Sequence, residues 1–342
     1  MIREIREQPA AIEATLAAEG GNIRELADRL RRDGAEYALI AARGTSDNAG
    51  LYGLYMFGAV TMKLAATAAP SLLTLYDTQI DLSKVFVLGV SQSGKATDVI
   101  EVLEAGRRRG AITCALTNTE DSPICQAAEH VLLTHAREEK SVAATKTYTT
   151  ALAVMHQLAA LWADRKDIAD EIKRVPAWID MTLERVQEDI ADRAERYRFM
   201  ETCHWLARGY NFCTAKEAAL KMAECCYVVP SAFSTADFMH GPIATTGEGF
   251  PCFVVAPTGR AFGAVLETVD ALEQRQAELA IISNDAALLE RAKIALPIPE
   301  MPEECTPMVA AVIGQLLAYT IALEKGLDPD TPRGLRKVTL TL

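Results

Sequence analysis

The chain has 342 residues, of which half are hydrophobic, so it can bury the cores of two domains. Its 46 acidic residues outnumber 35 basic ones and give a net charge of −11, which argues against a nucleic acid or an anionic membrane as partner. The eight cysteines form no C-x-x-C pair and the five histidines show no H-x-x-x-H spacing, so neither a metal site nor a redox pair is expected.

The first 34 residues are charged and follow a helical pattern, so they are expected to form a helical leader. They lack the apolar centre of a signal peptide, and no unbroken run of about 18 apolar residues follows. We therefore expect a cytoplasmic protein without a membrane span.

Short apolar runs then alternate with amphipathic stretches, which predicts βαβ units around a parallel sheet. The expected strands of the first domain, residues 35–165, lie at 37–43, 63–69, 85–90, 112–118 and 130–135. A helical span at 143–197, interrupted near Pro176, includes a charged connector at 166–195. The expected second domain, 196–342, has strands at 203–209, 225–232, 251–257, 278–284 and 293–299, and a closing helix at 306–325.

The two halves echo each other, because the strands at 40–44 and 205–209 each lead into an Ala-Arg-Gly turn and then a helix. The repeated order of elements around these turns makes duplication of one α/β domain the simplest account. Ligands of such sheets bind beyond the carboxyl ends of the strands.

The segment GVSQSGKAT, residues 89–97, comes within one residue of a nucleotide-binding P-loop. Ala96 stands where that motif needs a hydroxyl to bind Mg²⁺, so an ATPase is disfavoured. The hydroxyls of Ser91, Ser93 and Thr97 at a strand-to-helix turn would suit a phosphate monoester. The alternative is an ordinary turn in which a serine caps the helix.

A second hydroxyl-rich turn follows the first strand, in the segment RGTSDNAG at 43–50. Adjacent parallel strands lie about 5 Å apart, so Ser46 could join Ser91 and Ser93 on one phosphate. The alternative is again a helix cap, made here by Ser46 or Asp47.

The second half carries Glu217, Lys221 and Glu224 at positions i, i+4 and i+7 of an expected helix, and hence on one face. On an exposed helix this is a stabilising Glu–Lys pair. The neighbouring residues are apolar, however, and a buried glutamate acquires the raised pKa that a proton shuttle needs.

Two further candidates lie in loops or at the chain end. His240 precedes a Gly-Pro turn, where it is either structural or a catalytic histidine held by a rigid loop. Lys337 belongs to a C-terminal tail whose alternating apolar residues predict docking, and a desolvated lysine can form a Schiff base with a carbonyl.

Six motifs in order resemble the double sugar-isomerase-domain (SIS) family, especially the isomerase half of glucosamine-6-phosphate synthases and the class II glucosamine-6-phosphate deaminases. They are ARGTSDNAG, SQSG, EEKSVAATKTYTT, ALKMAE, HGPIA and PRGLRKVT. The resemblance spans residues 35 to 342. It implies an α/β protein of two tandem SIS domains, each a flavodoxin-like parallel sheet flanked by helices, with a helical leader and a docked C-terminal tail.

The resemblance also implies residue roles. Ser46, Ser91, Gln92 and Ser93 would hold a sugar 6-phosphate, with Thr45 and Thr97 beside them. His240 from the neighbouring subunit of a homodimer would open the sugar ring, and Glu224 would move a proton between C1 and C2. Lys337 would form a Schiff base with the keto sugar, while Lys221 and Glu217 would flank its reacting end. These steps need only acid–base and covalent chemistry, so no cofactor is implied.

Three departures from the synthases modify this expectation. No glutaminase domain is expected in the 35 residues before the first strand, Ala96 replaces a phosphate-binding threonine, and Asp237 replaces a glutamate before the histidine. Several motifs resemble the deaminases more closely, so the favoured reaction is glucosamine 6-phosphate plus water to fructose 6-phosphate plus ammonia. The alternatives are a fructosamine-6-phosphate deglycase, an ammonia-dependent synthase and a non-catalytic sugar-phosphate-binding regulator.

Overall fold

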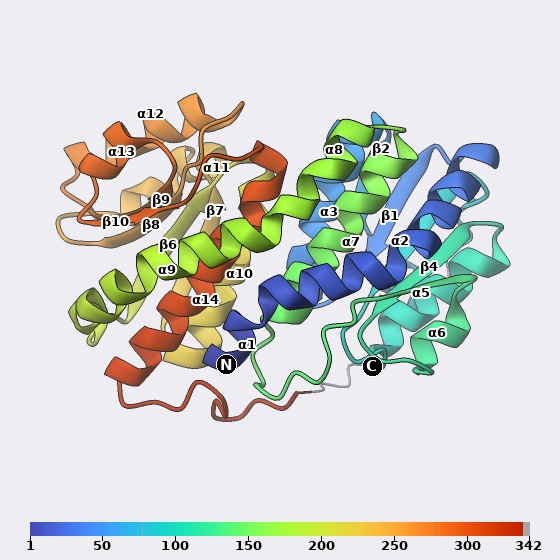
Figure 1. Ribbon diagram of the computed structural model, residues 1–342, viewed down its shortest axis with the longest axis horizontal. Coiled ribbons are helices and arrows are strands. Elements are labelled where there is room, and N and C mark those ends of the chain that lie inside the picture. The colour runs from blue at the N-terminus through green and yellow to red at the C-terminus, as the bar shows by residue number, and fades with distance from the viewer. Residues whose placement is uncertain (77, 338–342) are drawn as a thin grey trace. The chain divides into compact units, whose positions relative to one another are not determined.

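The computed structural model describes residues 1–76 and 78–337 (Figure 1). Its internal contacts divide the chain into two compact units, each built on one five-stranded sheet. The first-sheet unit comprises residues 10–139, 146–173 and the chain from residue 336, and the second-sheet unit comprises 1–9, 140–145 and 174–335. Each unit thus combines one long range with shorter segments from elsewhere in the chain.

The sheet of the first-sheet unit is parallel throughout, in the order β2-β1-β3-β4-β5. Its strands are β1 (Tyr37–Ala41), β2 (Leu64–Thr67), β3 (Val85–Val90), β4 (Ile112–Thr117) and β5 (His130–Leu133). The chain adds β2 on one side of β1 and the later strands on the other. The point where the order reverses therefore lies between β1 and β3, whose ends are in register at Ala41 and Gly89.

Helices cover both faces of this sheet because its strands are apolar on both sides. On one face Phe57 of α3 (Thr45–Thr61) and Trp162 of α7 (Lys146–Trp162) pack around Phe86 of β3, with ring centroids 5.8–6.0 Å apart. The apolar face of α5 (Thr97–Arg108) and α6 (Pro123–Ala127) packs on the other. The remaining helices are α2 (Gln8–Arg32), α4 (Ser71–Thr74) and α8 (Lys166–Glu171).

The second-sheet unit repeats this plan, with a parallel sheet in the order β7-β6-β8-β9-β10. Its strands are β6 (Thr202–Ala207), β7 (Val229–Ser234), β8 (Pro251–Val255), β9 (Glu278–Ser283) and β10 (Ile294–Pro297). Numbered from its own first strand, this sheet has the order 2-1-3-4-5, the same as the first. The predicted pair of equivalent α/β domains is confirmed.

The helices of this unit are again placed on both faces of the sheet. Figure 1 shows α14 (Thr306–Glu324) beside α10 (Phe212–Cys226) and α9 (Val175–Arg193). Trp205 stacks on Phe253 at 4.6 Å, while α12 (Phe262–Gln274) covers a second apolar cluster with Leu206 and Val254. The shorter helices are α1 (Ile2–Arg6), α11 (Thr235–Met239) and α13 (Ala286–Glu290), and 3-10 turns lie at 172–174, 194–197, 209–211, 242–245 and 303–305.

One helical stretch, Glu303–Glu324, is long and apolar enough to cross a membrane by length and composition. The structure buries 83% of its apolar window inside the fold, as expected for a helix of the core. The cysteines also serve the core, since seven of the eight are buried and none forms a disulfide in the described residues.

All ten predicted strands are present, with small shifts at their ends. The helical span after β5 differs more: it breaks at residues 163–165, where Asp164 adopts a left-handed φ of 54°, and again before α9. The second break, the 3-10 turn at 172–174, confirms the expected interruption near Pro176. Pro176 itself lies in the first turn of α9, where an amide hydrogen is not needed. The expected second-domain strand at 225–232 begins later, at Val229, because α10 continues to Cys226.

Candidate functional site

The loop after β3 is held in place by the main chain around it. The amide of Asn118 donates to the carbonyl of Gln92 at 3.1 Å, and the amide of Ile124 donates to that of Gly94 at 3.1 Å. Gly94 has a φ of 66°, and a Cβ there would lie 2.0 Å from the hydroxyl of Ser122. Only glycine fits this turn, which orients the loop toward the point where the strand order reverses.

The hydroxyls of this loop do not cap the helix that follows it. Ala96 is the N-cap of α5 and Gly44 is the N-cap of α3, and neither end has a capping side-chain hydrogen bond. The alternative that serines serve here as N-caps is therefore wrong. In the described part of the chain, the side chains of Ser46, Ser91, Gln92 and Ser93 form no hydrogen bond to the protein, whereas Thr45 and Thr97 have partners. The first four can bind a ligand without breaking an existing contact.

Two cations border these loops, and the sequence analysis did not select either as a ligand-binding residue. Arg43, after β1, contacts Asp98 of α5 with 2.5 Å between Nε and Oδ2, and half of its side chain is exposed. Lys95 is exposed in the loop after β3. Because the chain is strongly acidic overall, local cations are the expected way to attract an anion. That argument, applied to the two loops, could have identified both.

Helix α10 carries the expected row of charges. Lys221 is fully buried, and its Nζ lies 3.3 Å from an oxygen of Glu217 and 2.5 Å from one of Glu224. Burial by itself lowers the pKa of the lysine, but the two carboxylates outweigh burial and raise the pKa of Lys221 above its usual value. Lys221 is therefore an ammonium group that links the two carboxylates.

The two carboxylates differ in their surroundings. Glu217 is buried, whereas 23% of the Glu224 side chain is exposed in the last turn of α10. The expectation that one face of a largely buried helix carries all three charges is confirmed. The expectation of burial holds for Glu217 and is wrong for Glu224, because α10 emerges at its carboxyl end.

His240 is exposed and lies directly after α11. Its amide donates to the carbonyl of Asp237 at 3.2 Å, and the chain then turns at Gly241, which has a φ of 151°. Its side chain is therefore excluded from the core. Two other histidines do serve the core: His156, between the Tyr52 hydroxyl and the Ile168 carbonyl, and His204, beside the Thr245 hydroxyl.

The chain between α14 and Lys337 docks in two steps. Within the second-sheet unit, the guanidinium of Arg333 lies 4.2 Å from the ring centre of Tyr227, and its amide donates to the Tyr227 hydroxyl. Within the first-sheet unit, the Lys337 ammonium donates to Glu139 at 2.7 Å. Sequence reasoning missed Glu139, which belongs to the motif EEKSVAATKTYTT. The rest of the expected tail, residues 338–342, lies outside the described residues.

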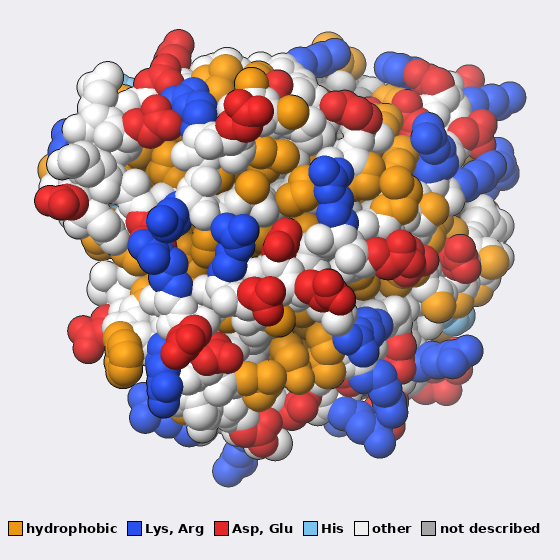
Figure 2. Space-filling model, turned by 60° about the vertical axis from the view of Figure 1, so that its left-hand side comes forward, with side chains coloured by type: hydrophobic (Ala, Val, Ile, Leu, Met, Phe, Trp, Pro, Cys, Tyr) orange, Lys and Arg blue, Asp and Glu red, His pale blue; other side chains and the backbone are white. Residues whose placement is uncertain are grey.

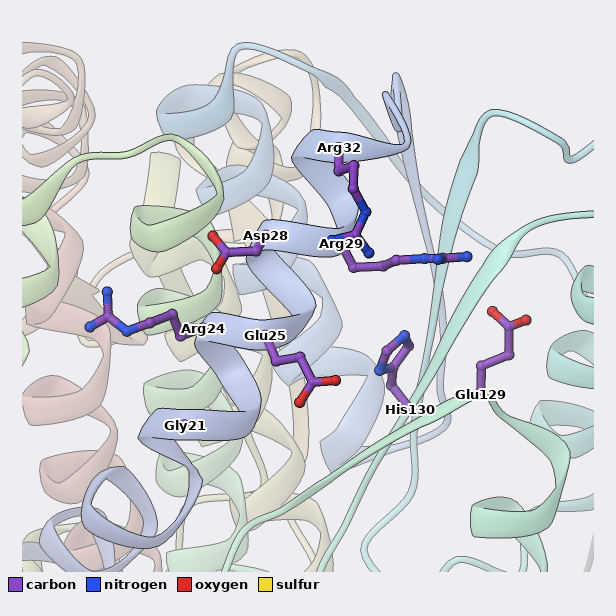
Figure 3. A pocket seen from close by; sticks show the side chains of 8 residues that line it. All are labelled: Gly21, Arg24, Glu25, Asp28, Arg29, Arg32, Glu129 and His130. Carbon is purple, nitrogen blue, oxygen red and sulfur yellow. The ribbon is translucent and has the colours of Figure 1, made fainter.

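A surface pocket of about 560 Å³ lies elsewhere in the first-sheet unit (Figure 3). Arginines 24, 29 and 32 of α2 line it together with Glu129 and His130. Because His130 begins β5, this pocket is at the amino ends of the strands, opposite the edge where ligands bind. On the face shown in Figure 2, acidic and basic side chains intermingle.

Comparison with known proteins accounts for the repeated plan. The model of the SIS domain matches residues 34–161 and again 203–325, one match for each sheet. The chain belongs to the SIS domain family. We therefore call the part on the first sheet the first SIS domain and the part on the second sheet the second SIS domain.

Similar proteins include glutamine–fructose-6-phosphate aminotransferases. Those of Pyrococcus horikoshii and Aquifex aeolicus are each 32% identical over 98% of this chain, which spans 57% of their length. The solved C-terminal domain of the Francisella tularensis glucosamine–fructose-6-phosphate aminotransferase matches 97% of both chains with a TM-score of 0.88 and 25% identity. A glucosamine-6-phosphate deaminase from Thermotoga maritima, 19% identical over 99% of both chains with a TM-score of 0.78, shares the fold.

Proposed function

We propose that this chain is an enzyme that converts glucosamine 6-phosphate and water into fructose 6-phosphate and ammonia. Its relatives are named for a reaction between fructose 6-phosphate and an amine donor, and an isomerising site of that kind can run in either direction. The motifs ARGTSDN, SVAATKTY and LRKVT support the deaminating direction, because they resemble those of class II deaminases.

The main support for a catalytic function is the row of three charged side chains on α10, namely Glu217, Lys221 and Glu224, which we call the charge row. Burying Lys221 between Glu217 and Glu224 removes three charges partly or wholly from water, which costs several kcal/mol per fully buried ion before pairing offsets it. A protein that only senses a sugar phosphate has no need for such a group. An enzyme that moves a proton between two carbons does, because the ammonium holds the Glu224 carboxylate in one orientation.

In the proposed mechanism, the 6-phosphate is bound by the side chains of Ser46, Ser91, Gln92 and Ser93, which form no hydrogen bond to the described residues, with Thr45 and Thr97 near them. His240, supplied by the neighbouring subunit of a homodimer, opens the sugar ring. Glu224 then removes the proton from C2 and delivers it to C1, while one amine proton passes to O1. These transfers convert the 2-amino aldehyde into a 2-imine with a C1 hydroxyl.

Lys337 completes the reaction. Its amine adds to C2 of the imine, ammonia leaves with a proton from the lysine nitrogen, and water then hydrolyses the lysine Schiff base to fructose 6-phosphate. No bound metal or cofactor enters these steps. We place the enzyme in the cytoplasm as a homodimer, as its composition and the exposed His240 suggest.

The test is release of ammonia and fructose 6-phosphate from glucosamine 6-phosphate by the unmodified protein, Glu224→Gln and Lys337→Ala. We expect equimolar products from the unmodified protein and losses of about 1,000-fold or more in both variants. Glu290→Gln, which changes an exposed carboxylate of α13, is the matched control and should keep full activity.

Other outcomes would replace the proposal. Turnover of fructosamine 6-phosphates in place of glucosamine 6-phosphate would identify a deglycase. Activity only from fructose 6-phosphate and ammonia would identify a synthase. Tight binding of these sugars with no turnover, unchanged in Glu224→Gln, would identify a regulator.

A further inference from the structure

Glu139 is the charged partner of the lysine to which we assign covalent chemistry. We propose that Glu139 is the positioning residue for Lys337: it orients the lysine amine toward the sugar and stabilises the positively charged Schiff base. This inference rests on the proposed function, and it adds a residue from the first SIS domain to that reaction.

The contacts of Glu139 fix its carboxylate. The side chain has no exposed surface, and it precedes α7. Its Oε1 accepts the amide hydrogen of Thr147 at 3.1 Å, and its Oε2 accepts the Thr147 hydroxyl at 2.8 Å. Thr147 lies in the first turn of the 17-residue helix α7, so the carboxylate meets the positive end of that helix. Glu139 is thus a rigid carboxylate whose place is set by the fold.

The lysine is more exposed to solvent than its carboxylate partner. Its side chain is 25% exposed, and its Nζ lies 2.7 Å from Oε2 of Glu139. Lysine has a flexible stem, so a hydrogen bond at its tip decides where the nitrogen points. Once the amine is neutral, an N–H directed at Glu139 leaves the nitrogen lone pair directed away from the carboxylate and available to a carbonyl carbon.

The same contact acts on the intermediate. When the lone pair of Lys337 forms a bond to C2 of a keto sugar, the carbonyl oxygen takes up protons and leaves as water. The product is an iminium ion whose nitrogen keeps one hydrogen and carries a positive charge. A fixed carboxylate at hydrogen-bond distance lowers the energy of that cation far more in a buried site than in water. Glu139→Gln keeps an acceptor of the same size and removes only the charge.

The experiment traps the Schiff base. The full-length protein is incubated with fructose 6-phosphate and reduced with borohydride, and the modified residue is located by mass spectrometry. We expect an adduct on Lys337 in the unmodified protein and a yield at least about 10-fold lower in Glu139→Gln. In Glu139→Gln, the affinity for glucitol 6-phosphate, which has no carbonyl, should change less than about threefold. For the deamination of glucosamine 6-phosphate by this variant, kcat should fall by about 100-fold with KM nearly constant.

Thr147→Val is the matched control. It removes the hydroxyl that supports Glu139 but leaves the carboxylate and its charge, so its adduct yield should stay within about threefold of that of the unmodified protein. Glu139→Asp retains the charge and should recover part of the adduct yield lost in Glu139→Gln. It therefore tests the role of the carboxylate even if Glu139→Gln fails to fold.

The outcomes separate this inference from the proposed function. No adduct in the unmodified protein would overturn the role of Lys337, and the proposed mechanism with it. An adduct that forms equally well in Glu139→Gln would overturn only the role of Glu139. Equal losses in Thr147→Val and Glu139→Gln would also overturn it, because they would mean that the carboxylate merely supports the start of α7.

Discussion

The two SIS domains have the same strand order but differ at the position where that order reverses. After β3 the first domain reads Ser-Gln-Ser-Gly-Lys-Ala at 91–96, and after β8 the second reads Ala-Pro-Thr-Gly-Arg-Ala at 256–261. The glycine, the following cation and the alanine that precedes the helix are retained. The serines and glutamine of the first domain are replaced by alanine, proline and threonine.

The second domain also fills the corresponding space with its own side chain. The carboxylate of Glu303 accepts the amides of Arg260 and Ala261 at 2.9 and 3.3 Å, at the start of α12. A Cβ on Gly259 would lie 2.6 Å from Cδ of Glu303, so the carboxylate packs directly against the loop. The Thr258 hydroxyl is engaged with Asn284 at 2.7 Å.

A carboxylate of the protein thus occupies the position at which the first domain presents Ser91 and Ser93, whose hydroxyls form no hydrogen bond to the described part of the chain. Backbone amides at the start of a helix favour an anion in both cases, and the two domains satisfy them in different ways. We infer that duplication left phosphate recognition to the first domain, while α10 of the second acquired the charge row of Glu217, Lys221 and Glu224.

The largest expected effect concerns the hydroxyls. The double variant Ser91→Ala and Ser93→Ala should weaken binding of glucosamine 6-phosphate by about 100-fold or more, because each hydrogen bond to a charged group contributes about 1.5–3 kcal/mol. Thr258→Ala in the second domain should leave the dissociation constant within about twofold. Isothermal titration calorimetry at fixed ionic strength measures both, and equal effects in the two domains would contradict the comparison.

The next effect concerns acid stability. Burial lowers the pKa of His156 in the first domain to about 4, although a hydrogen bond to the Ile168 carbonyl partly opposes it. The unfolded chain binds this proton near pH 6.5, so the stabilisation is complete above that pH and is lost as the pH falls from 6.5 toward 4. The full loss amounts to about 3 kcal/mol.

Burial also lowers the pKa of His204 in the second domain, but that ring retains some exposure. Hydrogen exchange at pH 7 and pH 5 should therefore show a larger loss of protection in α7 than in β6. The variant His156→Gln should flatten the pH dependence of α7. An unchanged pH dependence in that variant would assign the acid sensitivity to another group.

A smaller effect is expected from Glu303. Glu303→Gln removes a charged acceptor from the start of α12 and should lower the local stability of that helix by about 1–2 kcal/mol. Hydrogen exchange of residues 262–274 reports this loss, and Glu290→Gln should show none. If the carboxylate stands in for an anion, inorganic phosphate should restore protection in Glu303→Ala and have no effect on the unmodified protein.

The smallest effect distinguishes two equivalent arginines. Arg43 and Arg208 follow the first strands of their domains and precede glycines with φ values of 58° and 63°. Arg43→Gln should weaken glucosamine 6-phosphate binding by about fivefold, since the guanidinium is half exposed and already paired with Asp98. Arg208→Gln should leave it unchanged. The effect of Arg43→Gln should diminish at high salt, and an effect independent of salt would indicate a structural role.

Much of the fold could be predicted from local patterns in the sequence. The strands are short apolar runs bounded by helical periodicity, so all ten were predicted within a few residues. The Ala-Arg-Gly echo indicated the duplication, and the spacing of Glu217, Lys221 and Glu224 placed them on one face. The break at Asp164 and the continuation of α10 to Cys226 were not predicted, because helix ends depend on packing that no local pattern encodes.

The sequence by itself determined the parallel α/β plan and the repeat, which follow from periodicity, and the spacing that places Glu217, Lys221 and Glu224 on one helix face. Only the tertiary structure decided which polar residues are committed to the fold. Among the residues that the structure describes, it left the hydroxyls of Ser46, Ser91 and Ser93 without hydrogen-bond partners. It also placed the carboxylate of Glu303 against the equivalent loop of the second domain and paired Lys337 with Glu139. The two contacts join residues distant in sequence, 43 positions apart for Glu303 and Arg260 and 198 for Glu139 and Lys337, and such contacts are set by packing and burial.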